Sequence, residues 1–408
     1  MVQDTELLPS AEFRRRLAAR GGATASRCFQ CATCSSVCDL AFDGSHFPRR
    51  QILASQWGLA DRLAGDPGAW LCHQCNDCNV SCPRDARPGD VMQSIRALSV
   101  ECLAAPRFMG KLVGNADRTW PTLLGAPLLI WLILLGLTTG FHVPEATNQK
   151  TIHSLAAHSL VDTAIADDQS SGGLTHVTGS ETRLVYEEFV PHKLIYGVYF
   201  TAAFLVLLAI AISGKRFWKL LGRHGDRSGS FWANLMAVLG EIGSHKRFST
   251  CEASAARRWA HFSLLWGFVG AAVTSGLLIV AMYISRTPLP LAQIHPYKIL
   301  GNVSAVLLLV GIVAMLANRR GDRKRAGAMR PFDRFFLAIV VLVIITGVLA
   351  EVGAFVMAPV LAVGIYVVHL GSVLCLFLTF PYSKFAHMVY RTLALVHERM
   401  SAPGAATS

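Results

Sequence analysis

The pattern of apolar and polar positions divides the chain into two parts. Before about residue 105 the apolar residues recur at helical spacing in short segments, whereas after residue 120 they form long runs with few charges. The runs are Pro121–Phe141, Leu194–Ile212, Trp259–Ile284, Tyr297–Ala317, Phe335–Met357 and Val360–Phe380. In a helix rising about 1.5 Å per residue, each run can cross about 30 Å of hydrocarbon. The pattern therefore predicts an all-α protein with six transmembrane helices.

The N-terminal part carries two cysteine runs of identical spacing, C-x2-C-x2-C-x3-C. The first run is Cys28, Cys31, Cys34 and Cys38, and the second is Cys72, Cys75, Cys78 and Cys82, followed by Pro83. This is the bacterial two-cluster spacing, in which the fourth cysteine of each run ligates the other cluster. It predicts one [4Fe–4S] cluster on Cys28, Cys31, Cys34 and Cys82. The other cluster is predicted on Cys72, Cys75, Cys78 and Cys38.

Structural zinc is the alternative for these cysteines, because C-x2-C pairs also build zinc ribbons. Zinc needs four ligands and no third evenly spaced cysteine, so two complete runs favour iron–sulfur clusters. Disulfides fit less well, since gaps this short suit a metal better than a crosslink.

Helical periodicity around the cysteines predicts how the chain is organised. Helices are expected at Glu12–Arg20, Pro48–Leu63 and Pro88–Leu103, with a turn at Gly65–Gly68. This pattern is typical of a small α-helical ferredoxin, with helices between the cluster loops. The predicted domains are residues 1–105 for the ferredoxin, 106–120 for a linker and 121–400 for a cytochrome b-like bundle.

The net charge of +12 is explained by membrane topology rather than by nucleic-acid binding. Basic residues concentrate in the N-terminal part and in the loops after the second and fourth spans. The loop His142–Val190 instead has two basic residues against seven carboxylates. Because basic loops stay in the cytoplasm, both termini and the ferredoxin are predicted to be cytoplasmic. No signal peptide and no C-x-x-C-H haem-attachment motif is expected.

Histidines in or beside the apolar runs are candidate haem ligands, because ionisable residues in a membrane are costly. His369 and His387 are eighteen residues apart, which on one continuous helix is five turns and about 27 Å. They would then face one side and serve two stacked b-type haems. We predict His261 as the partner of His387. For His369 the expected partner is His295, with His192 as the competing choice.

Two charged residues are candidates for quinone binding and proton transfer. Lys298 follows His295 by three residues, and Glu351 lies toward the outer end of the fifth span. A cation and a carboxylate beside the outer haem could bind a quinone carbonyl and move its protons. Snorkelling to the membrane interface is the alternative for both.

The complete pattern resembles a known fusion. The N-terminal part looks like the iron–sulfur C subunit of heterodisulfide reductase. The membrane part looks like the cytochrome b subunits of heterodisulfide reductase and respiratory nitrate reductase. A chain that joins both resembles the C subunits of quinone-interacting membrane-bound oxidoreductase (Qmo) complexes. Besides the cysteine runs, the resemblance rests on segments Ser244–Cys251, Arg258–His261 and His295–Lys298, and on the spacing of His369 and His387.

The resemblance implies an electron-transfer subunit that links the quinone pool, through haem b and two clusters, to flavin and iron–sulfur subunits. Adenylylsulfate reductase would be the indirect partner. The chain departs from the nitrate reductase pattern at Ala271, where a second histidine is expected ten residues after His261. This departure leaves open the second ligand of the outer haem and the choice between two haems and one. Alternatives are a membrane subunit of a heterodisulfide reductase-type complex and a non-redox membrane anchor.

Overall fold

The computed structural model describes residues 8–41, 46–143, 147–148, 182–244, 255–284, 291, 293–321 and 325–401. Helices dominate these residues, and the two-residue strands β1 (Thr147–Asn148) and β2 (Thr182–Arg183) pair antiparallel. The chain separates into two compact units. The first is Met1–Leu123, Ala202–Val341 and Cys375–Ser408, and the second is Leu124–Thr201 and Leu342–Leu374. The all-α class is confirmed.

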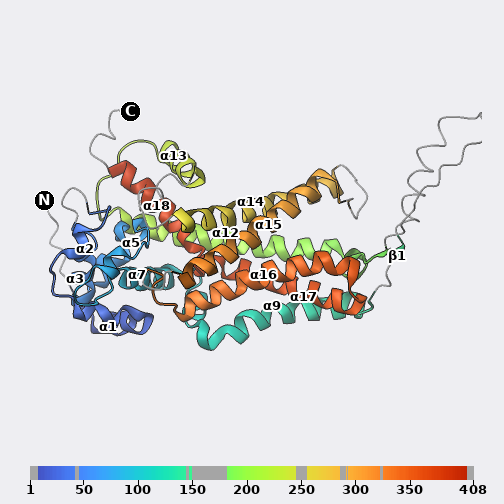
Figure 1. The fold of residues 1–408 in the computed structure, drawn as a ribbon, viewed down its shortest axis with the longest axis horizontal. Helices are drawn as coiled ribbons and strands as arrows, with labels where there is room; N and C mark the ends of the chain where they lie inside the picture. The colour runs from blue at the N-terminus through green and yellow to red at the C-terminus, as the bar shows by residue number, and fades with distance from the viewer. Residues whose placement is uncertain are drawn as a thin grey trace, which may run out of the picture. The chain divides into compact units, whose positions relative to one another are not determined.

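The N-terminal region of the first unit is a set of short helices around one longer helix (Figure 1). They are α1 (Ala11–Leu17), the π-helix Ala18–Gly22, the 3-10 helix Ala23–Arg27, α2 (Thr33–Ser36), α3 (Arg49–Trp57), α4 (Ala60–Ala64), α5 (Pro67–Leu71), α6 (Asp77–Val80) and α7 (Pro88–Leu103). Helix α7 has the predicted bounds. The predicted helix Pro48–Leu63 is instead two helices, because Gly58 ends α3 at a φ of +72°. The predicted turn near Gly65 leads into α5, with Asp66 as its N-cap and Pro67 in its first turn.

Helix α7 forms the centre of this region's core. Its residues Val91, Met92, Ile95 and Leu98 are fully buried and pack with apolar residues of α1, α3 and α4. Cys28, Cys38 and Cys72 lie against the same core. The core therefore fixes the loops that carry the cysteines.

All six predicted spans are helices long and apolar enough to cross a membrane. They are α9 (Ala116–Thr139), α12 (His192–Leu221), α14 (Ala255–Tyr283), α15 (Pro296–Gly321), α16 (Pro331–Val356) and α17 (Pro359–Thr379). The short helix α8 (Arg107–Gly114) precedes the first of them, and α11 (Tyr186–Phe189) and α13 (Phe231–Ser244) lie between them. Residues 106–120, predicted as a linker, are helical in α8 and the first turn of α9.

The last predicted span is broken, which corrects one step of the sequence argument. Helix α17 ends at Thr379, Phe380–Tyr382 is a 3-10 turn, and α18 (Ala386–Ser401) follows. Pro381 lacks an N–H and Ser383 is extended, with φ −98° and ψ −169°, so the helical hydrogen bonds stop there. The expectation that one continuous helix carries His369 and His387 is wrong. Their predicted five-turn separation therefore does not hold.

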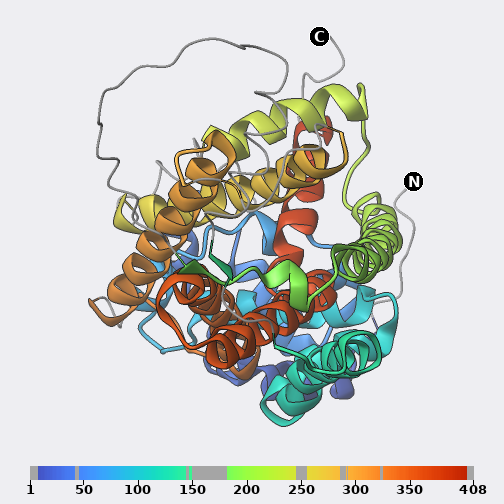
Figure 2. The ribbon, with the colours of Figure 1, turned by 90° about the vertical axis from the view of Figure 1, so that its right-hand side faces the viewer.

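Helices α14 and α15 lie side by side in both ribbon views (Figures 1 and 2). Their contact depends on small residues, since a Cβ on Gly267 would lie 2.8 Å from Leu308 and one on Gly311 would lie 2.7 Å from Leu264. The hydroxyl of Ser263 donates to the carbonyl of Leu307 across the contact at 2.7 Å. Such close packing is typical of helix pairs in membranes.

The second unit is held by tyrosines that donate to helix carbonyls. Tyr186 donates to the carbonyl of Ala350 at 2.7 Å and stacks on Tyr366, with ring centroids 4.4 Å apart. Tyr199 donates to the carbonyl of Leu370, also at 2.7 Å. These contacts join α11 to α16 and α17, and α12 to α17.

Candidate functional site

The eight cysteines of the two runs surround two separate cavities. The first cysteine site is the cavity lined by Cys28, Cys31, Cys34 and Cys82. The second cysteine site is the cavity lined by Cys38, Cys72, Cys75 and Cys78. Each cavity thus has three cysteines from one run and the fourth from the other, which is the grouping that the spacing predicts. Their role as cluster ligands stays a prediction.

The repeat in sequence is also a repeat in backbone conformation. The residues two and four positions after the first cysteine of each run have positive φ: Gln30 and Ala32, then Gln74 and Asn76. The backbone N–H of Gln30 donates to Cys28 Sγ, and that of Gln74 to Cys72 Sγ, both at 3.4 Å. Left-handed turns of this kind collect N–H groups into anion-binding loops, and N–H donors favour a thiolate over a thiol. Both loops therefore have the backbone that an anionic sulfur ligand needs.

The cysteines differ in exposure and therefore in acidity. Burial raises the pKa of the Cys34 thiol to about 11 and that of Cys38 to about 12, and it raises the pKa of Cys78 as well. The exposed Cys31 lies 3.4 Å from the hydroxyl of Thr33, and this hydrogen bond lowers its pKa. Without a ligand, the buried thiols keep their protons at neutral pH. Binding a cluster would release them.

No three His, Cys, Asp or Glu side chains in the described residues converge closely enough to hold a single metal ion. The cysteines in that part of the chain are all free thiols, including the exposed Cys102 and the buried Cys375.

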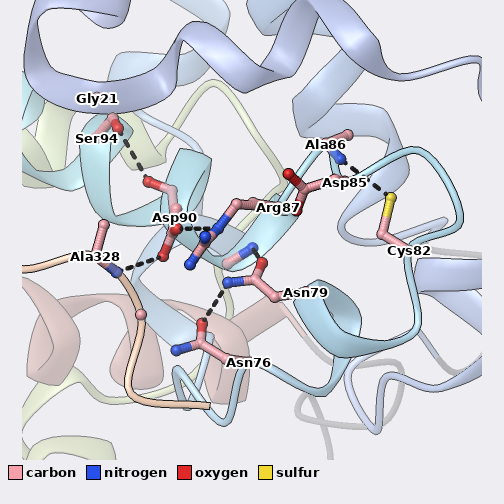
Figure 3. A network of polar contacts seen from close by, with 12 residues as sticks. Gly21, Asn76, Asn79, Cys82, Asp85, Ala86, Arg87, Asp90, Ser94 and Ala328 are labelled. Carbon is pink, nitrogen blue, oxygen red and sulfur yellow. Dashed lines mark hydrogen bonds and ion pairs between the residues drawn. The ribbon is translucent and has the colours of Figure 1, made fainter. Parts of the chain in front are cut away.

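The loop of the second cysteine site is bonded to the loop between α15 and α16. The side-chain amide of Asn76 donates to the carbonyl of Arg325 at 2.7 Å, and the Arg325 guanidinium pairs with Asp77 at 2.9 Å. Figure 3 shows the adjoining network, in which Asn79 bonds Asn76 and the backbone N–H of Ala328 approaches the carboxylate of Asp90. Long-range contacts thus hold this loop against the membrane part of the first unit.

Arg330 anchors the same α15–α16 loop in the N-terminal core. Its side chain is 9% exposed and donates to the carbonyl of Gly21 at 3.0 Å and to that of Asp90 at 2.6 Å. It also bonds the carbonyl of Arg20 and the hydroxyl of Ser94. Burial is the main effect on the pKa of Arg330 and lowers it, while the nearby Asp90 and Asp333 oppose that shift.

His261 on α14 and His387 on α18 face each other within the first unit. Their ring centroids are 6.3 Å apart and their planes make an angle of 73°. Two imidazoles that share one metal through bonds of about 2 Å have centroids about 6 Å apart. The spacing therefore fits one metal between the two rings. It brings together the pair predicted for the inner haem.

A hydrogen bond determines which ring nitrogen of His387 carries the proton. Nδ1 of His387 bonds the backbone carbonyl of Lys384, and a carbonyl can only accept. The proton of the neutral ring is therefore on Nδ1, and Nε2 keeps its lone pair. Metal-bound histidines are oriented in this way.

His369 has the equivalent arrangement in the second unit. Its Nδ1 lies 3.1 Å from the hydroxyl of the buried Thr346. That hydroxyl already donates its one proton to the carbonyl of Leu342 at 2.6 Å. Nδ1 of His369 must then be the donor to Thr346, which leaves its Nε2 lone pair available. Gly347 leaves room for the ring, because a Cβ there would lie 3.0 Å from His369 Cε1.

The remaining predicted site residues lie at helix ends. His295 precedes α15, and its Nδ1 accepts from the backbone N–H of Tyr297 at 3.3 Å, as a helix cap does. His192 begins α12 and stacks on Tyr196, with centroids 6.0 Å apart. Lys298 lies in the first turn of α15 and Glu351 near the end of α16, and both are half-buried. Ser244–Cys251, used in the resemblance, lies outside the described residues after Ser244.

Comparison with protein families places both parts of the chain. Residues 24–86 match the 4Fe-4S dicluster domain, so the N-terminal part is a ferredoxin domain of this kind. Residues 175–406, more than half of the chain, match the family described as Citrate utilization protein B. The chain belongs to the citrate utilization protein B family.

Curated relatives of this family member fall into the same two groups. It is 34% identical over 85 residues to the C subunit of the heterodisulfide,ferredoxin reductase of Methanothermobacter thermautotrophicus, a match to 21% of this chain and 46% of the relative. It is 40% identical over 75 residues to an Archaeoglobus profundus protein described as like the C subunit of heterodisulfide reductase, covering 18% and 40% of the two chains. Similarity to Citrate utilization protein B of Escherichia coli is 25% identity over 350 residues, 80% of each chain.

The archaeal and Escherichia coli relatives match different shares of the chain. The present chain spans less than half the length of the two archaeal relatives that it matches. The likeness to them covers about a fifth of this chain, whereas the likeness to the Escherichia coli protein covers 80% of it. No solved structure matches the chain. The resemblance to cytochrome b subunits and to Qmo complexes stays a prediction.

Sequence reasoning missed Arg330, Thr346 and Arg391 as residues that support the sites. Arg391 has a sequence signal, because it lies four residues after His387 on one face of α18. Arg330 and Thr346 have none, because their partners come from distant segments.

Proposed function

We propose that the chain is the membrane electron-transfer subunit of a quinone-dependent oxidoreductase. Its two [4Fe–4S] clusters and b-type haems would supply one-electron transfer between a membrane quinone and a soluble flavoprotein. The observation that carries the proposal is that the second cysteine site and the His261–His387 pair belong to one compact unit. The ligand loop and the ligand helix are bonded directly, since Arg391 of α18 donates to the carbonyl of Cys72 at 3.1 Å.

The ligands follow from the two cysteine sites and the two histidine environments. Cys28, Cys31, Cys34 and Cys82 would hold one cluster, and Cys38, Cys72, Cys75 and Cys78 the other. His261 and His387 would hold the inner haem, with the Lys384 carbonyl fixing the ring of His387. His369 would hold the outer haem, with Thr346 fixing its ring.

The second ligand of the outer haem would be His192 or His295. The N–H of Tyr297 bonds Nδ1 of His295, so a neutral His295 ring carries its proton on Nε2. His295 would have to give up this arrangement to bind through Nε2. His192 is therefore the first of the two to test.

The contacts of the basic loops support one orientation of the protein in the membrane. Arg325 and Arg330, after α15, bond the ferredoxin domain, and Arg216, near the end of α12, donates to the carbonyl of Ala104 at 2.8 Å. The ferredoxin domain and these arginines therefore share one side. We infer from the positive-inside rule that this side is the cytoplasm and that the protein is a multi-pass protein of the inner membrane. Lys298 and Glu351 stay the candidates for quinone binding and proton transfer.

Two partners are supported by different parts of the chain. The match over 80% of Citrate utilization protein B favours a soluble oxidoreductase that serves the use of citrate. The Qmo resemblance, which rests on the fusion itself, implies adenylylsulfate reductase. The similarity to the C subunit of heterodisulfide,ferredoxin reductase keeps a complex of that type as an alternative.

The decisive experiment measures cofactors and quinol oxidation on the purified membrane protein. We expect a reducible b-type spectrum, about eight non-haem irons per chain, and reduction of haem and clusters by a menaquinol or ubiquinol analogue. His387→Ala should lose the inner haem and block quinol reduction of the clusters while the non-haem iron content stays unchanged. Zinc in place of iron, or iron and haem that no quinol reduces, would contradict the proposal. Adding adenylylsulfate reductase or a citrate-linked flavoprotein to the reduced protein then separates the partners by which one reoxidises it.

A further inference from the structure

Arg391 lies between the proposed inner haem site and the second cysteine site. It is on α18, one helical turn after His387, so both side chains are on the same face of the helix. One amino group of its guanidinium donates to the carbonyls of Trp70, at 3.3 Å, and Cys72, at 3.1 Å. The other bonds Nδ1 of His73 at 3.1 Å. Arg391 thus links α18, which carries the predicted haem ligand His387, to the backbone of the predicted cluster ligand Cys72.

A second arginine bonds the same carbonyl from another direction. Arg96 of α7 donates to the carbonyl of Cys72 at 2.6 Å and to that of Ala69. Two guanidinium groups therefore lie at the residue that would supply the first ligand of the second cluster. At the first cysteine site, Arg84 instead stacks over Phe29, with its Cζ 4.1 Å from the ring centroid.

The elements around Arg391 are packed so that its position is fixed. Trp70 of α5 packs against Tyr390 of α18, with centroids 4.8 Å apart and the rings tilted by 36°, and both rings contact Phe217 of α12. Trp70, Phe217 and Tyr390 are all buried. This aromatic cluster holds α5, whose C-cap is Cys72, against α18.

We propose that Arg391 is a positioning residue that holds the second cluster beside the inner haem and raises the cluster's reduction potential. This inference rests on the proposed function. Each transfer moves one electron between the haem iron at His261 and His387 and the second cluster, so that one is oxidised and the other is reduced. Reduction adds a negative charge to the cluster, and a nearby guanidinium stabilises that charge. The alternative role for Arg391 is capping of the α5 carbonyls, which would not need the charge.

The test is a redox titration of the full-length loaded protein, followed by electron paramagnetic resonance. Cys31→Ser and Cys75→Ser assign the signals of the first and second clusters. In Arg391→Gln the midpoint potential of the second cluster should fall. At the wild-type midpoint, the ratio of reduced to oxidised second cluster should drop roughly tenfold. The first cluster should titrate as in wild type.

Two further variants separate charge from packing. Arg391→Lys keeps the charge with a different geometry and should restore the wild-type midpoint. Arg399→Gln is the matched control, because Arg399 is two turns further along α18 and pairs with Glu241. It should shift neither cluster.

Several outcomes would overturn the inference. One is an unchanged second-cluster midpoint in Arg391→Gln, and another is an equal shift of the first cluster or in Arg399→Gln. If the Arg391→Gln protein binds no second cluster, the Arg391→Lys protein decides whether the inference holds. A restored cluster with the wild-type midpoint supports the proposal, and a missing or low-potential cluster overturns it. A wild-type protein without clusters or haem overturns the proposed function itself, so the two failures are distinguishable.

Discussion

The two cysteine sites share one backbone design but have different neighbours. Both have left-handed residues at the same positions and an N–H to sulfur hydrogen bond of the same length. At the first site Cys31 is exposed and Phe29 is 69% exposed. At the second site the loop is bonded to Arg391 of α18 and Arg325 after α15.

The comparison indicates that the backbone of each cysteine loop and the neighbours of that loop are determined separately. Local sequence builds each cluster loop, and the surrounding elements decide what each loop meets. In the proposed function the second site receives electrons from, or gives them to, the membrane haem. The first site is then the one that meets the soluble partner.

The largest expected effect tests whether the two sites share cysteines. Cys38→Ser should lose half of the non-haem iron, because its cluster is completed by Cys72, Cys75 and Cys78. Adding Cys75→Ser should cost nothing more, whereas adding Cys31→Ser should remove nearly all the non-haem iron. Non-haem iron and acid-labile sulfide per chain measure this.

The control is Cys102→Ser, an exposed thiol outside both sites, which should keep full iron. If Cys38→Ser with Cys31→Ser kept half the iron, each run would ligate its own cluster and the crossed grouping would be wrong.

A second change targets Arg330, which bonds the α15–α16 loop to the N-terminal core. Arg330→Met removes a buried guanidinium and leaves the carbonyls of Gly21 and Asp90 without their donor. We expect each unpaired carbonyl to lower the free energy of unfolding by about 1–3 kcal/mol. Chelators should then remove iron faster, and from the second site before the first. Thermal unfolding and the rate of iron release measure the effect.

The exposed Arg334 provides the comparison variant, because Arg334→Met should change stability by less than about 0.5 kcal/mol. Equal iron loss from both sites in Arg330→Met would show that this contact does not distinguish them.

A smaller effect is expected at the outer haem. Thr346→Val removes the acceptor that fixes Nδ1–H of His369, so haem affinity at that site should fall about 10–100-fold. The haem at His261 and His387 should be retained, and redox-resolved optical spectra distinguish the two. Thr274→Val is the control, since Thr274 bonds the carbonyl of Gly270 on its own helix. Loss of both haems, or of neither, would contradict separate sites.

The smallest effect concerns the cluster-free protein. The pKa of Cys31 is lowered by its hydrogen bond to Thr33, whereas burial raises that of Cys34 to about 11. The thiolate is the reactive form, so Cys31 should be alkylated at lower pH than Cys34. Rates from pH 6 to 9 by peptide mass mapping measure this. Thr33→Val should shift the Cys31 profile to higher pH, and identical profiles for both thiols would contradict the assignment.

Patterns of short range were read correctly from the sequence. Helix α7 begins and ends where its periodicity predicted, and six apolar runs became six helices. His261 and His387 were paired by their similar depth in the predicted spans; their ring centroids lie 6.3 Å apart, and their role as haem ligands stays a prediction. The continuous last helix was wrong, because the apolar pattern continues through Pro381 while the backbone hydrogen bonds do not.

Spacing along the chain was enough to specify the ligand loops, because three cysteines within seven residues depend on local backbone alone. It also specified the spans, because a long apolar segment has few alternatives to a helix in lipid. Tertiary structure decided which neighbours each loop acquired. Arg391 and Cys72 are separated by 319 positions, and no periodicity connects residues so far apart. Their contact exists because Trp70, Phe217 and Tyr390 pack three separate helices together.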